Sequence, residues 1–200
     1  MLKRPMVPER GFSIIELMVT VALIAILLVM TIPAYGTWTA DARVRAVAES
    51  LANAIRQSQS TAVAKGRTSL FALTADPRPA VGSVPSANAS NWLAALNVLG
   101  GSDETRASLG LILQSTEGSQ HQVTITGPAL VCFNALGRQT SLSASANSFP
   151  ASCTAADPAV YQVSRASGAS RSFNVLVYAG GRVRMCDAAK AISATNPDGC

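Results

Sequence analysis

Several ingredients of common catalytic and metal sites are missing from this sequence. It has a single histidine, His121, and its four cysteines form no Cys-x-x-Cys pair. Zinc sites and Ser–His–acid centres are built from such groups, so we expect neither. There is no phosphate-binding glycine loop, and the acidic pair Asp103 and Glu104 sits in a glycine-flanked segment that suits solvated charge. We therefore expect no metal, no cofactor and no enzymatic activity.

The sequence also has few charged residues, and basic residues outnumber acidic ones only slightly. Charged residues make up 14% of the chain, and the formal net charge is +5. Lys3, Arg4 and Arg10 outnumber Glu9 in the first eleven residues, so residues 12–200 carry a net charge of +3. An excess this small does not by itself indicate a nucleic-acid partner.

What the sequence does contain is one long apolar run over residues 11–32, behind a short basic leader. Roughly 20 such residues can cross a bilayer as a helix, and basic residues mark its cytoplasmic flank. A secretory signal peptide fits less well, because the run is too long and no small-x-small cleavage site follows it. We expect a leader at residues 1–11 and a transmembrane helix at residues 12–36.

One acid, Glu16, interrupts the apolar run. A carboxylate inside a membrane span costs on the order of 3 kcal/mol and needs a partner. Cleavage between Gly11 and Phe12 would create an α-amino group one helical turn from Glu16, where the two charges can neutralise each other. The alternative is an ordinary signal anchor that tolerates the glutamate.

These residues resemble the class III signal of type IV pilins and of type II secretion pseudopilins. The resemblance rests on Gly-Phe-Ser-Ile-Ile-Glu-Leu at residues 11–17 after a basic leader. It implies cleavage after Gly11 by a prepilin peptidase, N-methylation of Phe12 and a role for Glu16 in filament assembly. It also implies a single-pass inner-membrane protein with a periplasmic domain, which later joins other pilins in a pilus at the cell surface.

The remaining pattern predicts an α+β domain. Apolar residues recur at helical spacing over residues 40–65, and Gly66 is a suitable stop, so residues 12–65 predict one helix of about 80 Å with an interruption at Pro33 and Gly36. Its amphipathic half, residues 37–66, should pack on an antiparallel sheet formed by residues 67–200. Strand-like segments are residues 67–74, 109–113, 122–126, 130–134, 160–164, 172–178 and 182–186. Residues 75–108 suggest a long loop or insertion, with a short helix at residues 92–99.

All four cysteines follow the apolar run, in the part expected to be exported. An even number of cysteines in an oxidising compartment indicates disulfides. Three pairings are possible. We expect the one that closes the smallest loops, Cys132 with Cys153 and Cys186 with Cys200.

Arginines accumulate near the C-terminus. Strand alternation puts Val183 and Met185 on one face of a strand and Arg182 and Arg184 side by side on the other. Paired guanidinium groups suit phosphate oxygens and give salt-dependent binding without base readout. The alternative is a solvated strand face on which Arg184 pairs with Asp187.

The late Gly-Arg-x-Arg segment, the long helix and the β-rich domain together resemble minor pilins and pseudopilins of the GspH/FimT type. In FimT-like members this motif serves DNA capture during natural transformation, which implies that role for Arg182 and Arg184. Lys190 is added to this DNA-binding set only because it carries a positive charge. Gly137-Arg138 also looks family-like, and we interpret it as a turn. The sequence thus predicts a minor pilin that binds double-stranded DNA, the alternative being a type II secretion pseudopilin that binds other pseudopilins or cargo.

Overall fold

The computed structural model describes residues 11, 13–97, 110–143, 152–166 and 171–200, without the side chains of residues 30–34. The chain divides into two compact units, residues 1–39 and residues 40–200. Helix α1, Ile14–Lys65, contributes to both. The first ten residues, Phe12 and residues 98–109 lie outside the described part, which therefore includes only Gly11 of the leader and lacks the end of the predicted insertion.

Helix α1 matches the prediction closely. It continues through Pro33 and Gly36, where we predicted an interruption. It ends where Gly66 takes a positive φ of +60°, with hydrogen bonds from Gly66 N to Val63 O (3.2 Å) and from Arg67 N to Ala62 O (3.0 Å). This pair of bonds caps the last carbonyl groups of a helix and favours glycine at the left-handed position. Gly66 is therefore the stop that the sequence predicted.

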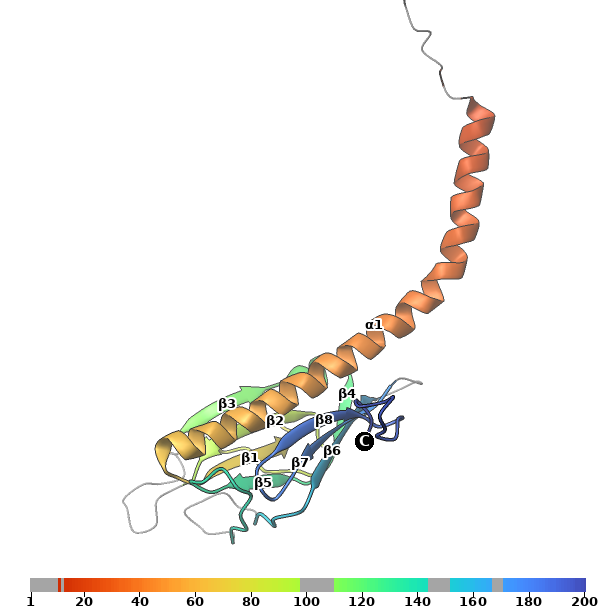
Figure 1. The fold of residues 1–200 in the computed structure, drawn as a ribbon. Coiled ribbons are helices and arrows are strands. Elements are labelled where there is room, and N and C mark those ends of the chain that lie inside the picture. Colours follow the sequence, from red (N-terminus) through yellow and green to blue (C-terminus); the bar gives the residue numbers. More distant parts are fainter. Residues whose placement is uncertain (1–10, 12, 98–109, 144–151, 167–170) are drawn as a thin grey trace, which may run out of the picture. The chain divides into compact units, whose positions relative to one another are not determined.

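The strands form two antiparallel sheets, where we predicted one (Figure 1). The first sheet has the order β3-β2-β1-β5 and the second the order β4-β6-β7-β8. In the first, β1 is Ser69–Thr74, β2 Asn91–Leu96, β3 Leu111–Ser115 and β5 Leu130–Phe133. In the second, β4 is Val123–Thr126, β6 Ala159–Arg165, β7 Phe173–Val177 and β8 Val183–Asp187. A single turn of helix, α2 (Glu117–Gln120), precedes β4.

Residues 40–65 of α1 lie across both sheets and build the main core with them (Figure 1). The predicted apolar stripe of this helix half is buried, with Val47, Leu51 and Ile55 all at 0% exposure. Phe71 of β1 and Tyr161 of β6 meet edge to face, with ring centroids 6.0 Å apart. One core therefore joins the helix to both sheets.

Strand β2 corrects the prediction for residues 75–108. Residues 92–99 were expected to form a short helix in an insertion, but β2 is an interior strand that pairs with both β1 and β3. Trp92 and Ala94 face the main core, while Leu93 and Ala95 face a second apolar cluster on the opposite side of the sheet. Because both faces are buried, the segment lacks the polar alternation that reveals a half-exposed strand.

Candidate functional site

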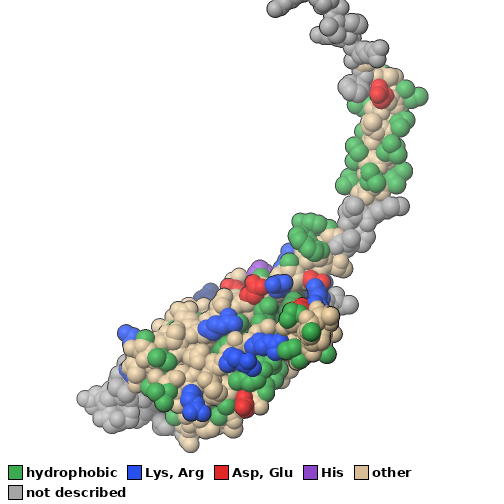
Figure 2. Space-filling model, in the orientation of Figure 1, with side chains coloured by type: hydrophobic (Ala, Val, Ile, Leu, Met, Phe, Trp, Pro, Cys, Tyr) green, Lys and Arg blue, Asp and Glu red, His purple; other side chains and the backbone are tan. Residues whose placement is uncertain are grey.

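The N-terminal unit presents an apolar helix surface. Gly11 is exposed and Glu16 lies exposed in the first turn of α1. Exposed large apolar side chains follow, from Ile14 (81% exposed) to Val29 (72% exposed), and those on the face seen in Figure 2 are drawn in green. Phe12, the predicted methylation site, is outside the described residues. Over the part of the chain that is described, no helix is long and apolar enough to qualify as a membrane span.

Both disulfides join the sequential partners. Cys132 of β5 is bonded to Cys153, with the Cα atoms 6.0 Å apart, and Cys186 of β8 is bonded to Cys200, with the Cα atoms 5.2 Å apart. Cys132 and Cys153 are buried in the second apolar cluster. The other bond fastens the end of the chain to β8.

The two arginines of the Gly-Arg-x-Arg segment have different surroundings. Arg182 is exposed, and its guanidinium carbon lies 4.2 Å from the centre of the Tyr178 ring. Arg184 is half-buried, and its Nη2 donates to the carbonyl oxygens of Gly199 (2.7 Å) and Pro197 (3.2 Å). Arg184 therefore holds the C-terminal loop, whereas Arg182 presents its charge to solvent.

Two other cations near the C-terminus, Arg171 and Lys190, form ion pairs with acids. Lys190 Nζ lies 2.5 Å from Asp198 Oδ2 and 3.9 Å from Asp187 Oδ2. The hydrogen bond from Lys190 lowers the pKa of Asp198 below its ordinary value. Asp187 is buried and accepts from Arg171 Nη2 at 2.9 Å, so the Arg184–Asp187 pair that we considered is replaced by an Arg171–Asp187 pair. Of the predicted set of Arg182, Arg184 and Lys190, Arg182 is the most available to a ligand.

Two glycine turns meet at the start of β8, a juxtaposition that the sequence did not reveal. Gln59 Nε2 of α1 donates to the carbonyl oxygens of Gly137 (2.6 Å) and Gly181 (2.8 Å). Gly181 has a φ of +92°, and a Cβ at this position would overlap Gly137 O and Gln59 Nε2. Arg138 and Arg182 thus follow two glycines whose backbones are in contact.

Groups suited to catalysis or metal binding are not brought together in the described residues. No cluster of three His, Cys, Asp or Glu side chains there could hold a metal ion. His121 is exposed at the end of α2. Asp103 and Glu104 lie outside the described part.

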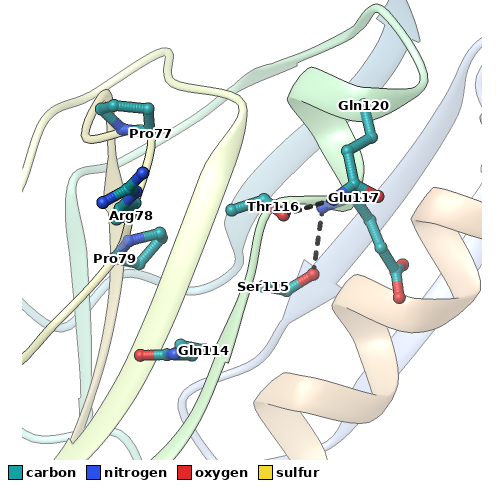
Figure 3. A pocket seen from close by; sticks show the side chains of 8 residues that line it. All are labelled: Pro77, Arg78, Pro79, Gln114, Ser115, Thr116, Glu117 and Gln120. Carbon is teal, nitrogen blue, oxygen red and sulfur yellow. Dashed lines mark hydrogen bonds between the residues drawn. The ribbon is translucent and has the colours of Figure 1, made fainter.

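A pocket of 560 Å³ lies between residues 77–79 on one side and residues 114–117 and 120 on the other (Figure 3). Its charged side chains are Arg78 and Glu117, and Figure 3 shows the Glu117 carboxylate directed away from the loop that carries Arg78. The Glu117 N–H donates to Ser115 Oγ at 3.2 Å. This lining holds no histidine or cysteine, and we assign it no chemistry.

Comparison with known proteins supports the interpretation of the N-terminus. Residues 6–32 match the model of the prokaryotic N-terminal methylation motif. The chain therefore carries the methylation motif of type IV pilins, followed by a long helix packed on antiparallel β-structure, which confirms the predicted fold class. Membership of the GspH/FimT group stays a prediction.

Among solved structures, the chain is similar to the type IV minor pilin FimU of Pseudomonas aeruginosa in two crystal forms. Sequence identity is 14% in both cases, with TM-scores of 0.46 and 0.44. The likeness covers 74% of this chain and 91% or 95% of the FimU chains. No curated protein matches the sequence.

Proposed function

We propose that this chain is a minor pilin, a structural subunit of a type IV pilus. The observation that carries the proposal is the difference in burial between the two halves of α1. Residues 14–29, which lie within the matched methylation motif, expose apolar side chains on all sides, whereas residues 44–62 are built into the globular core. An exposed apolar helix needs a cover, which lipid supplies in the membrane and neighbouring helices supply in a filament.

The proposal assigns a role to each N-terminal residue of the motif. Prepilin peptidase cuts between Gly11 and Phe12, and Phe12 is then methylated. Glu16, exposed in the first turn of α1, pairs with an N-terminal amino group during assembly. The chain is anchored in the inner membrane with its globular unit in the periplasm, and it then enters the pilus at the cell surface.

The test compares Gly11→Leu, Glu16→Ala and the control Thr20→Ala in cells that assemble the pilus. Thr20 is another polar side chain of the same helix, and its hydroxyl donates to Leu17 O within that helix. Gly11→Leu should remain full-length on a gel. Glu16→Ala should be processed but absent from sheared filaments, while Thr20→Ala is present. Normal incorporation of Glu16→Ala would contradict the assembly role, and incorporation into a secretion pseudopilus instead of a pilus would favour the pseudopilin alternative.

We also propose that the subunit binds double-stranded DNA without sequence preference, for uptake in natural transformation. The support is Arg182, an exposed guanidinium group that forms no ion pair within the described residues. A guanidinium group is well suited to phosphate oxygens. Arg184 and Lys190 belong to the same site, and their bonds to the C-terminal loop and to Asp198 make them the weaker contributors.

DNA binding is tested with the full chain in a mild nonionic detergent and a fluorescent DNA duplex, over a salt series. Each phosphate contact that is lost should lower the slope of log affinity against log salt by about 0.9. Arg182→Ala should therefore bind more weakly and with a shallower slope. Arg165→Ala removes an exposed arginine from the opposite end of the second sheet and should bind as wild type does. If the wild-type chain does not bind at low salt, the DNA role is wrong and a structural pilin remains.

A further inference from the structure

The contact between the two glycine turns places a second exposed arginine beside the proposed DNA site. Gly181 approaches Gly137 so closely that a side chain on Gly181 would overlap the Gly137 carbonyl oxygen. The next residue along each turn is an arginine, Arg138 or Arg182, and both are exposed. Two Gly-Arg pairs that are 44 positions apart in the sequence thus meet in space.

Both turns are held rigidly by their own hydrogen bonds. In the first, Asn134 Oδ1 accepts from the backbone N–H groups of Leu136 (3.0 Å) and Arg138 (3.1 Å). In the second, Gly181 N donates to Tyr178 O at 2.8 Å. Gln59 of α1 then ties the two turns together through their glycine carbonyl groups. The arginine backbones are therefore fixed before any ligand arrives, so only the side chains need to be ordered on binding.

The charge around the two turns is predominantly positive. Arg56 of α1 is exposed, and its Nη2 donates to Val183 O (3.2 Å) at the start of β8. None of Arg56, Arg138 and Arg182 forms a salt bridge with a described residue. One acid is near, since Asp157 Oδ1 accepts from Ala179 N at 3.0 Å. Lys and Arg side chains (blue) gather on the face that carries α1 and β8 in Figure 2.

We propose that Arg138 is a further phosphate-binding residue and that it acts with Arg182 as one two-arginine surface for a nucleic-acid backbone. This inference rests on the DNA binding proposed above and names a residue that the Gly-Arg-x-Arg segment does not contain. A duplex carries one negative charge per about 1.7 Å of its axis, so two neighbouring guanidinium groups find phosphates in many registers. Contacts to phosphate oxygens carry no base information, so binding through these two arginines is indifferent to sequence.

Arg138 is a favourable residue for a clean test, because its side chain forms no hydrogen bond or ion pair with any described residue that truncation would break. The full chain in detergent is titrated with a labelled DNA duplex over a salt series. The variants are Arg138→Ala, Arg182→Ala, the double variant, and the control Arg165→Ala. Unfolding midpoints are measured alongside, and they should be unchanged in Arg138→Ala.

The proposal expects each single variant to lower the salt slope by about 0.9 and the double variant by about twice as much. If Arg138→Ala behaves as Arg165→Ala does while Arg182→Ala weakens binding, the role of Arg138 is overturned and the DNA function stands. If the wild-type chain does not bind DNA at low salt, both the role of Arg138 and the DNA function are overturned. If Arg138→Ala and Arg182→Ala lose as much affinity for polyglutamate as for DNA, the surface binds an acidic protein partner instead, and the nucleic-acid assignment is overturned.

Discussion

Replacing Gly181 by alanine tests whether the two glycine turns are packed as tightly as the structure indicates. Gly181 has a φ of +92°, and the new Cβ would overlap both Gly137 O and Gln59 Nε2. A left-handed conformation costs a residue with a side chain about 1–2 kcal/mol. Displacing Gln59 forfeits two half-buried hydrogen bonds at about 0.5–1.5 kcal/mol each. We expect Gly181→Ala to lower the free energy of unfolding by about 2–5 kcal/mol.

Gly180 supplies a matched control one position earlier. A Cβ on Gly180 meets no atom within 4 Å, and its φ is not in the left-handed region. Gly180→Ala should therefore change the free energy of unfolding by no more than about 0.5 kcal/mol. The two variants add the same methyl group to adjacent residues, so their difference reports the left-handed conformation of Gly181 and the packing of the turns together.

The assay is urea unfolding of the full chain in mild detergent, followed by tryptophan fluorescence. Trp92 is buried (1% exposed) and reports the globular unit, whereas Trp38 is already 67% exposed. Adding Gln59→Ala should make Gly181→Ala less costly, because one of the two overlaps disappears. If Gly181→Ala and Gly180→Ala destabilise the protein equally, the contact between the turns is wrong.

Two further predictions concern the core and the C-terminal loop. Trp92→Ala should cost about 3–5 kcal/mol of unfolding free energy, because β2 buries this side chain in the main core, while Val84→Ala at a 69% exposed position should cost little. Lys190 lowers the pKa of Asp198, so the ionised carboxylate stabilises the fold above the ordinary value of 3.8, and this contribution is lost as the pH falls through the folded pKa. Asp198→Asn should therefore melt at a lower temperature than wild type at pH 6, and the difference should shrink as the pH falls through the folded pKa of Asp198.

The long helix was predictable because its signals are local. The apolar run, the spacing of Val47, Leu51 and Ile55, and the glycine at residue 66 each act within a few residues of the chain. The cysteine pairing also followed from loop length, since both bonds close short segments of 21 and 14 residues. Such features need no knowledge of the tertiary structure.

Strand β2 was missed because its environment is tertiary. Leucine and alanine in Asn91–Leu96 are good helix formers, and only the neighbours β1 and β3 turn the segment into a strand. The second sheet was missed for a related reason. Individual strands from residue 123 onward were recognisable, but which strand pairs with which depends on contacts between distant residues.

The surroundings of the individual arginines were likewise not predictable from the sequence. Strand alternation treats Arg182 and Arg184 as equivalent, yet the C-terminal loop, fastened by the Cys186–Cys200 bond, supplies two carbonyl oxygens to Arg184 alone. Conversely, Gly137-Arg138 could be interpreted from the sequence as a turn, but nothing local indicates that Arg138 lies near Arg182. It becomes the neighbour of Arg182 because Gln59, on a helix almost 80 residues earlier, binds both glycine turns at once. The pairing of Arg138 with Arg182 therefore depends on the contact between the two glycine turns. The Gly-Arg-x-Arg segment identifies only the arginines that lie on or beside β8.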